Sequence, residues 1–442
     1  MRIAIVGGGV GGLTAARALA ANGHDVHIFE ANDRAGGVVA TSVVDGFLCE
    51  HAASSFRGGA VKGAAALCKE LGVAVESAAP QAKRRYVYLD GKLRMVPSNP
   101  IELVRCDLLT WRGKLALVRE PFSPRREPRN EDQSMHDFAA RRLGPEAARA
   151  FIAPLVTGVY AADSHEVSLE AGFPTMAALD REGGFVRGTL KRLVRSRRAA
   201  AAPGRGGIAA PVGGLGSLIN ALATDLGSRL HRGVRVRAIE PVSNGVLVDG
   251  ERWDAAVVAI PAQTAAPLLR AMPQLVLRLQ AFRRSGVAIV YLGVPQDCSP
   301  RIRDAFGFLT AQGEDLRALG VVFESTLWRN RAPAGQALLR CIFAGSRDPS
   351  AYELTDRELI EQATRDVSRA FGTAIECTHT SVRRSPLGLP HYPVGHRDHV
   401  RDAVALARLG RIVLAGADYR GAGINDLAAD ADVIASEIAL WG

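Results

Sequence analysis

The sequence contains no uninterrupted apolar run of roughly 18 residues, so it predicts no membrane-spanning helix. It also lacks a leader ahead of its first structural element, because residues 2–6 already read as a buried strand that cleavage would destroy. We therefore expect the protein to stay in the cytoplasm. The cysteines are scattered without a C-x-x-C pair or metal-ligand spacing, which predicts reduced thiols and no metal site.

Acidic residues are the minority among the charged residues. Lys and Arg number 55 against 45 Asp and Glu, which gives a net charge of +10 and a pI of about 9.6. This balance suits an anionic partner: nucleic acid, an anionic membrane surface or an acidic small molecule. The densest basic cluster has no interleaved aromatic residue and no nucleic-acid motif, so we favour a solvated face or a lipid-headgroup contact and expect no nucleic-acid partner. This cluster consists of Lys191, Arg192, Arg195, Arg197 and Arg198.

A nucleotide-binding pattern opens the chain. The strand at residues 2–6 is followed by Gly7, Gly9 and Gly12 in G-x-G-x-x-G spacing, then by a small-residue helix and a second strand that ends at Glu30. The three glycines allow a tight turn, a close approach of backbone N–H groups to a pyrophosphate, and close packing of helix and strand. Glu30 stands where a carboxylate can accept a hydrogen bond from a ribose 2′-OH. The pattern predicts a Rossmann-like dinucleotide-binding domain.

The residues that follow favour FAD over NAD. Arg34, Gly36 and Gly37 resemble the E-x-x-x-R-x-G-G continuation of FAD-containing amine oxidases and their relatives. Ser54 and Ser55 match the segment that approaches the flavin in those relatives, although the three residues before them depart from the usual Gly-Pro.

The middle of the chain changes texture. Residues 84–93 read as a β-hairpin around an Asp-Gly turn, on which Arg85 is either a surface arginine or a ligand-facing one. Helical periodicity broken by prolines predicts a helical insertion at residues 99–204, with an apolar, basic-edged face that fits a membrane interface or an ordinary core. Residues 154–160 read as a small-residue bend where bare backbone could approach a flat ligand.

After a flexible connector at residues 197–210, the chain returns to nucleotide-binding chemistry. A glycine turn at residues 213–218 opens a helix, and strands are expected at residues 234–236 and 256–261. Residues 273–404 read as a substrate domain built on an antiparallel sheet.

A last buried strand ends in Gly416 and Asp418 and is followed by a helix that begins near Ile424 and Asp426. Asp or Asn at such a helix start is typical of an N-cap. In an FAD protein the same helix N-terminus can stabilise the negative charge of a reduced flavin.

In combination these patterns resemble the protoporphyrinogen oxidase family of FAD enzymes, within the amine-oxidase superfamily, over nearly the full length. The stretches most particular to that family are residues 320–325 and 389–396. The other matching stretches are residues 7–12, 54–56, 85–97, 155–161, 167–174, 213–218, 306–309, 319–333 and 414–426. The resemblance implies an α/β fold with a Rossmann-like FAD-binding domain (amine-oxidase/p-hydroxybenzoate-hydroxylase type), an α+β substrate domain and a helical insertion. Its expected bounds are 1–83, 205–272 and 405–442 for the FAD-binding domain, 84–98 and 273–404 for the substrate domain, and 99–204 for a helical, membrane-associating domain.

The resemblance also implies roles for single residues. Arg85 falls on the arginine that pairs with a substrate propionate. The apolar substrate-binding positions are Leu155, Gly158, Phe306, Leu309, Val322 and Ile342. The cofactor-binding positions are Gly7, Gly9, Gly12, Glu30, Arg34, Gly36, Gly37, Ser54, Ser55, Val236, Gly416, Asp418, Ile424 and Asp426.

The implied activity is FAD-dependent oxidation of protoporphyrinogen IX to protoporphyrin IX in late haem biosynthesis, with O₂ as the acceptor. Three hydride transfers to flavin N5 complete it, and H₂O₂ is the second product. The mechanism needs no side-chain triad or carboxylate pair, so we nominate no catalytic residue, His391 and His396 included. Residues 416–421 contain no cysteine, which predicts non-covalent FAD.

Alternatives stay open at this point. Coproporphyrinogen III, with four propionates, fits the same fold, and extra basic residues in the cavity would favour it. The others are an FAD-dependent amine oxidase and a non-catalytic FAD-binding chaperone or assembly factor. The expected partners are a tetrapyrrole, O₂ and, by peripheral contact, the anionic inner face of the cell membrane; a homodimer is left open.

Overall fold

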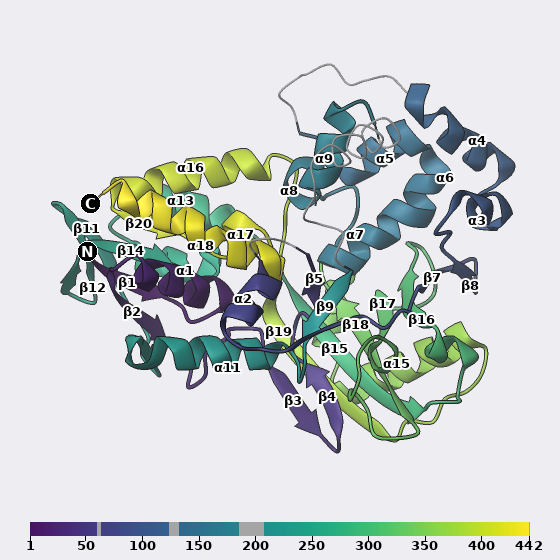
Figure 1. Cartoon of the computed structure of the whole chain (residues 1–442). Helices are drawn as coiled ribbons and strands as arrows, with labels where there is room; N and C mark the ends of the chain where they lie inside the picture. The colour runs from purple at the N-terminus through teal and green to yellow at the C-terminus, as the bar shows by residue number, and fades with distance from the viewer. Residues whose placement is uncertain (60–62, 123–131, 185–206, 442) are drawn as a thin grey trace.

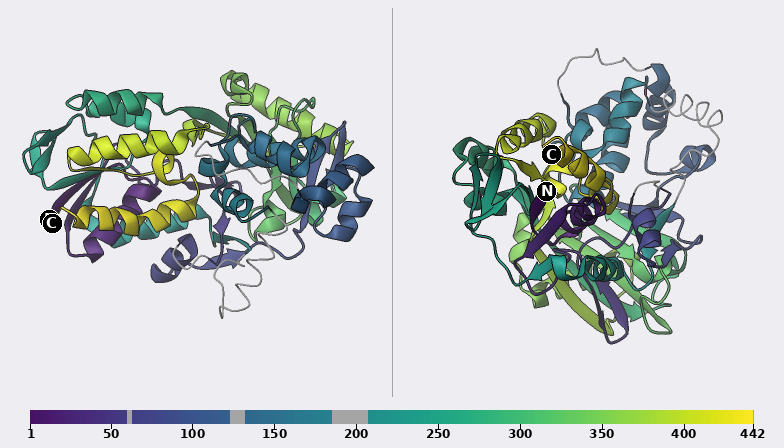
Figure 2. Two further views of the ribbon diagram at one scale, coloured as in Figure 1. Left: turned by 90° about the horizontal axis from the view of Figure 1, so that it is seen from above. Right: turned by 60° about the vertical axis from the view of Figure 1, so that its left-hand side comes forward.

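Two β-sheets and a group of helices make up three neighbouring regions (Figure 1). This computed structural model describes residues 1–59, 63–122, 132–184 and 207–441. A parallel sheet with its helices lies at the left of the view, a mixed sheet at the lower right and short helices at the upper right. Both termini lie at the outer end of the parallel-sheet region (Figure 2). Among the described residues, no helix is both long enough and apolar enough to cross a membrane.

The first sheet is parallel throughout, in the order β10-β2-β1-β14-β20. Its strands are β10 (Leu230–Arg232), β2 (Asp25–Glu30), β1 (Arg2–Val6), β14 (Ala255–Val258) and β20 (Ile412–Leu414). The helices on its two faces are α1 (Val10–Ala21), α11 (Leu215–Leu226) and α18 (Ile424–Ala439), and α13 (Pro273–Ala281) and α16 (His396–Leu409). Side chains alternate between the faces: Ile3 and Ile5 pack with α1, α11 and α18, whereas Ala4 and Val6 pack with α13 and α16.

The sequence prediction for this sheet is wrong at one strand. A strand was expected at residues 234–236, but the edge strand is β10, which pairs with β2 from Leu230 onward. Gly233 follows with a φ of 69°, a left-handed conformation that ends the strand. The later residues keep contact with β2 by one bond, from the Val234 N–H to the Glu30 carbonyl oxygen at 2.9 Å.

The second sheet has seven strands in the order β19-β15-β18-β17-β16-β7-β8. They are β19 (His379–Pro390), β15 (Arg284–Pro295), β18 (Gln336–Ala344), β17 (Gly320–Phe323), β16 (Ala305–Thr310), β7 (Arg84–Leu89) and β8 (Lys92–Met95). An antiparallel sheet was expected; the prediction is wrong for β7 and β16, which pair in parallel, so the sheet is mixed. The reason is topological, because the β7–β8 hairpin comes from far earlier in the chain and adds to the edge.

One face of the mixed sheet is closed by α15 (Asp356–Phe371). Phe308, Val321 and Cys341 point to this side and share a core with Leu359 and Ala363 of the helix. Because side chains alternate along each strand, their neighbours point to the opposite face, which is turned toward the parallel-sheet region.

The helical region contains α3 (Pro100–Arg105), α4 (Trp111–Arg119), α5 (Met135–Leu143), α6 (Pro145–Ala147), the π-helix η2 (Ala148–Ile152), α7 (Ala153–Tyr160), α8 (Leu169–Gly172) and α9 (Pro174–Arg181). The bend expected at residues 154–160 is wrong, because these residues form α7. Pro154 sits in the first turn of that helix, where its missing N–H costs no hydrogen bond. The basic cluster at residues 191–198 lies outside the described residues.

The remaining strands and helices connect these regions. The smaller strands are β3 (Thr41–Val44), β4 (Phe47–Glu50), β5 (Phe56–Arg57), β6 (Val75–Ser77), β9 (Ile208–Pro211), β11 (Ile239–Val242), β12 (Gly245–Val248) and β13 (Glu251–Trp253). The smaller helices are α2 (Ala64–Glu70), α12 (Ala262–Ala265), α14 (Glu324–Leu327) and α17 (Ala417–Arg420). The division into domains stays a prediction, and α13 and α16, expected in the substrate domain, share a core with the parallel sheet.

Buried polar contacts hold the two sheet regions together. The Glu50 carboxylate on β4 accepts from Thr41 Oγ1 at 2.6 Å, from the Leu215 N–H at 2.9 Å and from Arg331 Nη1 at 3.1 Å. Tyr291 Oη of β15 bonds to both the backbone N–H and the carbonyl oxygen of Glu50, at 3.0 and 2.8 Å. One acidic residue thus ties α11 of the parallel-sheet region to β15 and Arg331 of the other.

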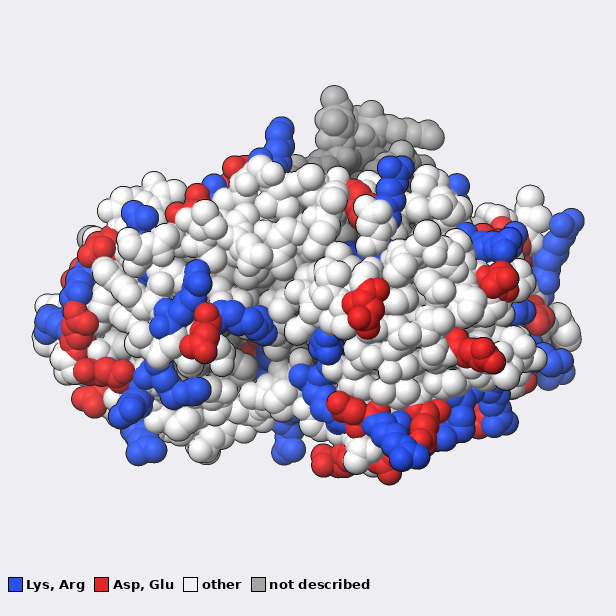
Figure 3. Space-filling view, turned by 90° about the horizontal axis from the view of Figure 1, so that it is seen from below, with Lys and Arg blue, Asp and Glu red and all other residues white. Residues whose placement is uncertain are grey.

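Charge of both signs is interspersed on the face seen from below (Figure 3). Lys and Arg side chains alternate there with Asp and Glu side chains along the lower edge, and broad uncharged areas lie between them. The excess of positive charge is therefore not gathered on this face.

Candidate functional site

The turn between β1 and α1 has the geometry that its glycines predict. Gly7 has a φ of 107°, which residues with a side chain rarely adopt. A Cβ on Gly12 would lie 2.0 Å from the Gly7 carbonyl oxygen, so turn and helix touch only because residue 12 has no side chain. Nothing lies within 4 Å of where a Gly9 Cβ would be, and no side chain caps α1. The first N–H groups of α1 can therefore meet an anion.

Glu30, at the end of β2, is buried and orders the turn beside it. Its Oε2 accepts a hydrogen bond from the Gly8 N–H at 2.8 Å. Its Oε1 accepts from the Asn32 backbone N–H at 2.8 Å and from the Asn32 side-chain amide at 2.7 Å. A carboxylate offers about four lone-pair positions, so capacity remains for a hydroxyl donor. Sequence reasoning missed Asn32, whose one signal was its place two residues after the strand-end acid.

These groups open onto a cavity of about 550 Å³ at the carboxyl ends of the parallel strands. This is the edge at which open α/β sheets bind their ligands. The predicted cofactor residues that line it are Gly7, Gly9, Glu30, Gly36, Gly37, Val236, Gly416 and Asp418. Arg284, Pro386 and Leu387 also line it, and because they belong to β15 and β19, the cavity reaches from the parallel sheet to the mixed sheet.

The other predicted cofactor residues do not line this cavity: Gly12, Arg34, Ser54, Ser55, Ile424 and Asp426. Arg34 acts one layer behind it. Its guanidinium donates hydrogen bonds to the carbonyl oxygens of Ala35, Gly37 and Val39 at 3.3, 2.7 and 3.3 Å. Arg34 therefore fixes the shape of the loop whose backbone forms one wall.

Asp418 is buried and joins the two sheets at the cavity. Its Oδ1 accepts from Arg284 Nε at 2.8 Å, and its Oδ2 accepts from the Ala262 N–H at 2.8 Å. Arg284 also donates to the Leu387 carbonyl oxygen at 2.6 Å. Sequence reasoning missed Arg284, because no local signal relates β15 to an acid 134 residues away.

The start of α18 differs from the expected capping. Gly423 is the N-cap and contributes no side chain, so the expectation of an Asp or Asn cap is wrong. Asp426 lies in the first turn and accepts from the Gly423 N–H at 3.1 Å, and burial raises the pKa of its carboxyl group. Asn425 instead bonds across the site, accepting from the Ala64 N–H at 2.9 Å and donating to the Arg57 carbonyl oxygen at 2.7 Å. Ile424 is buried in the core.

The face of the mixed sheet opposite α15 gathers the predicted substrate residues. Strand registers place Arg85, Gly307, Val322 and Arg340 in one row across four adjacent strands. Arg85 is exposed, with its guanidinium carbon 4.9 Å from the centre of the Phe306 ring, a cation–π contact. Gly307, with no side chain, leaves the floor between Arg85 and Val322 flat.

The remaining predicted substrate residues border this row. Leu309 lies two residues along β16 from Gly307, and a Cβ on Gly158 of α7 would lie 2.7 Å from a Leu309 methyl group. Leu155 precedes Gly158 by three residues, so both lie on one side of α7. Ile342 is the cross-strand neighbour of Gly320. Phe306, Leu309, Val322 and Ile342 are all half-buried, whereas their neighbours toward α15 are fully buried.

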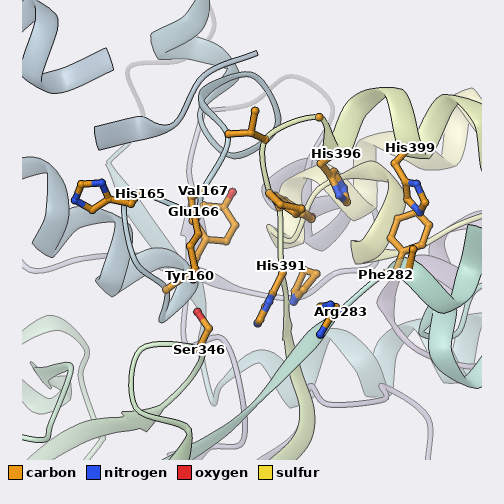
Figure 4. Close-up of a pocket in the computed structure, with 17 residues that line it drawn as sticks. Tyr160, His165, Glu166, Val167, Phe282, Arg283, Ser346, His391, His396 and His399 are labelled. Atoms are coloured by element: carbon orange, nitrogen blue, oxygen red, sulfur yellow. The ribbon is translucent and has the colours of Figure 1, made fainter. Parts of the chain in front are cut away.

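A second cavity, of about 710 Å³, lies where the helical region meets the end of β19 and the start of α16 (Figure 4). Tyr160, His391 and His396 line it, and sequence reasoning nominated neither histidine. His391 Nε2 is hydrogen-bonded to Ser285 Oγ, and burial lowers its pKa. Burial also lowers the pKa of His396 from 6.5 to about 4, against an opposing hydrogen bond to Asp418.

Comparison with known proteins identifies the family. Residues 10–426 match the flavin-containing amine oxidoreductase family. The chain is 29% identical over 464 residues to a chloroplastic protoporphyrinogen oxidase from Nicotiana tabacum, covering 98% of this chain and 84% of the relative. It is 31% identical over 488 residues to a coproporphyrinogen III oxidase from Propionibacterium freudenreichii subsp. freudenreichii, covering 99% and 90%. A crystal structure from Exiguobacterium sp. 255-15, provisionally assigned as a protoporphyrinogen oxidase, superposes with a TM-score of 0.84 at 24% identity, covering 99% and 98%. The α/β fold thus matches that of this family's solved structures.

His396 gives a pH-dependent prediction. Between pH 6.5 and about 4 the buried histidine binds fewer protons than the same residue in the unfolded chain, so its contribution to stability is complete above pH 6.5 and is lost as the pH falls. His396→Gln should therefore narrow the difference in melting temperature between pH 7.5 and pH 5, by an effect worth up to about 3 kcal/mol at 1.36 kcal/mol per pKa unit. His165→Gln, at an exposed position of the same cavity, is the control. An unchanged pH dependence in His396→Gln would contradict this account.

Proposed function

The chain belongs to the flavin-containing amine oxidoreductase family, and we propose that it binds FAD non-covalently and oxidises a porphyrinogen, protoporphyrinogen IX, to the porphyrin with O₂ as acceptor. The observation that carries this proposal is the open face of the mixed sheet. A row of half-buried apolar side chains there ends at the exposed cation of Arg85, beside the cavity of the parallel sheet. A flat macrocycle with acidic side chains needs such a combination.

The residues of the 550 Å³ cavity fit FAD. The uncapped N-terminus of α1 above Gly9 suits the pyrophosphate, and the strand-end Glu30 suits a ribose hydroxyl. Gly36, Gly37 and Gly416 leave backbone exposed along the cavity. Bound FAD supplies the hydride acceptor and passes the electrons to O₂.

The attachment of FAD is proposed to be non-covalent. All six cysteines are free, and none of them lines the cavity. Burial raises the thiol pKa values of Cys49, Cys68 and Cys341, which disfavours the reactive thiolate form. No thiol is therefore placed to form a bond to a flavin in that cavity.

The chain's own residues would mainly orient the substrate. Arg85 would pair with a propionate and set the direction of the macrocycle, while Phe306, Leu309, Val322 and Ile342 would contact its apolar surface. Gly158 lets α7 approach Leu309 and narrows the space above the sheet. Holding the reacting carbon in one orientation is a sufficient role for the protein where the cofactor carries out the chemistry.

Coproporphyrinogen III is the second candidate, since the named relatives include enzymes for both porphyrinogens. It has four propionates, and a preference for it would imply further cationic contacts beside Arg85. An amine oxidase is less well supported, because the exposed guanidinium at the mouth of the apolar face would repel a protonated amine.

We further propose a peripheral contact between the helical region and an anionic membrane. Apolar side chains that would fill a core in an ordinary helical bundle are exposed on α3, α4 and the turn after them: Ile101, Val104, Trp111, Leu115, Val118 and Phe122. The last four recur at helical spacing on one side of α4 and its extension. Arg105, Arg112 and Arg119 are exposed beside them. Apolar side chains flanked by arginines are typical of interfacial helices.

Turnover of the two porphyrinogens side by side, followed by porphyrin fluorescence in air, tests the proposed activity. We expect the wild-type protein to prefer protoporphyrinogen IX and Arg85→Ala to raise its KM about tenfold or more with FAD content unchanged, because a charge-assisted hydrogen bond is worth about 1.5–3 kcal/mol. Arg84→Ala is the matched control, since Arg84 pairs with Asp304 instead. Preference for coproporphyrinogen III would reassign the substrate, and turnover of neither with FAD bound would leave an amine oxidase or a non-catalytic FAD protein.

Vesicle co-sedimentation tests the membrane contact. Wild-type protein should bind vesicles of phosphatidylcholine with phosphatidylserine more than phosphatidylcholine alone, and less at high salt. Trp111→Asp combined with Val118→Asp should abolish this binding. Leu277→Asp, an exposed apolar position on α13, should not change it. Equal binding by all three proteins would rule out the helical face as the contact.

A further inference from the structure

Arg340 is a buried cation on the substrate-facing side of the mixed sheet. It lies on β18, in the same cross-strand row as Arg85, three strands away, or about 14 Å at the usual strand spacing. Val322 lies beside it in this row, and Ile342 lies two residues along the same strand. Sequence reasoning assigned Arg340 no role, although it is a charged residue between two positions of an otherwise apolar surface.

The guanidinium of Arg340 reaches across to the parallel-sheet region. Its Nη1 donates to Ser54 Oγ at 3.2 Å, and its Nη2 donates to the Ala52 carbonyl oxygen. The next residues are held from the other side, because the Arg57 carbonyl oxygen accepts from Asn425 at the start of α18. The segment of residues 52–57 is thus fixed between Arg340 of the mixed sheet and the first turn of α18.

The charge of Arg340 is only partly balanced. Glu324, 1% exposed, lies with Oε1 3.8 Å from Arg340 Nη1. Among the described residues, neither carboxylate oxygen of Glu324 accepts a hydrogen bond, and Arg340 Nε has no acceptor. The two groups form an ion pair without a direct hydrogen bond, in an interior where charges are weakly screened. Their fields therefore act on neighbouring groups over several ångströms.

A flavin bound along the 550 Å³ cavity would end beside this pair. The cavity extends from the glycine turn to Arg284, Pro386 and Leu387, which belong to the mixed sheet. Arg284 is on β15, and β15 is the strand next to β18. The segment that Arg340 holds is joined to the first turn of α18, which follows the cavity residues Gly416 and Asp418 in the chain. Arg340 is the cation of the substrate face that is bonded to this boundary.

We propose that Arg340 is a positioning residue that fixes residues 52–54 and, together with its counter-ion Glu324, sets the reduction potential of the bound flavin. The inference rests on the proposed function for the presence of FAD. A positive charge favours the reduced flavin, which carries negative charge, over the oxidised one, whereas the negative charge of Glu324 opposes it. The two residues should therefore have opposite effects, which a purely structural contact between the sheets would not produce.

The test measures the flavin midpoint potential of the purified holoenzyme by equilibration with a redox dye, without porphyrinogen. Arg340→Gln should lower the ratio of affinities for reduced and oxidised flavin about tenfold, a fall of about 30 mV for a two-electron couple. Glu324→Gln should raise the potential by a similar amount, and the double variant should lie near wild type. Arg340→Lys, which keeps the charge, should stay closer to wild type than Arg340→Gln.

The control is Arg383→Gln. Arg383 is also an arginine of the mixed sheet that bonds a serine of the other region, Ser42 Oγ at 3.0 Å, but it lies on β19. Its potential should equal that of wild type. If Arg340→Gln does not fold, Glu324→Gln alone tests the sign.

The outcomes separate the two proposals. Shifts of the same sign in Arg340→Gln and Glu324→Gln, or no shift in either, would overturn the role of Arg340. An altered KM for porphyrinogen with an unchanged potential would do the same and make Arg340 a substrate contact. Opposite shifts in a protein that does not turn over porphyrinogens would uphold this inference and refute the proposed substrate. A wild-type protein that binds no FAD would overturn both.

Discussion

Buried arginines that cross between the two sheet regions are the constraint on which the rest of the structure depends. Arg284 reaches Asp418, Arg331 reaches Glu50, and Arg340 reaches Ser54 and the Ala52 carbonyl oxygen. Each comes from the mixed-sheet side of the boundary, and each is nearly or fully buried. Removing one partner of such a pair leaves an uncompensated charge in the interior, a loss of about 3–5 kcal/mol. The relative position of the two sheets is therefore well determined.

This position determines which surfaces meet. The parallel sheet presents the carboxyl ends of its strands, where the glycine turn, Glu30 and the N-terminus of α1 lie. The mixed sheet presents the face that α15 does not cover, with its apolar side chains and Arg85. The account of function follows from this meeting of an anion-binding groove with an apolar wall that ends in a cation. Neither surface would suffice alone, because the groove has no place for a large apolar ligand and the wall has no place for a dinucleotide.

Features set by nearby residues were predictable from the sequence. The glycine turn, Glu30 and the hairpin turn at Asp90 and Gly91 depend on backbone conformations that particular residue types permit, and the structure has them. The bend expected around Pro154 was wrong because proline is tolerated in the first turn of a helix, so the residue alone does not distinguish the two cases. The edge strand was displaced because Gly233 ends it, which periodicity does not reveal.

Features that depend on distant parts of the chain were not predictable. Arg284 and Asp418, and Arg340 and Ser54, meet only through the packing of the two sheets, and no spacing in the sequence relates them. The exposure of Trp111 and Val118 likewise required the structure, because an amphipathic helix looks alike whether its apolar side faces a core or a membrane. The predicted substrate residues come from α7, β7, β16, β17 and β18, and the strand registers are what bring those of the sheet to one face.

The central claim is that a flavin held in the groove takes electrons directly from a porphyrinogen held on the wall. Anaerobic mixing of the purified holoenzyme with limiting protoporphyrinogen IX tests it most directly, with flavin absorbance and porphyrin fluorescence recorded together. The account predicts that the absorbance of oxidised flavin falls as porphyrin fluorescence rises, with three flavins reduced for each porphyrin formed, and that admission of air restores the flavin. Flavin that stays oxidised in the presence of protoporphyrinogen IX and of coproporphyrinogen III would contradict the claim.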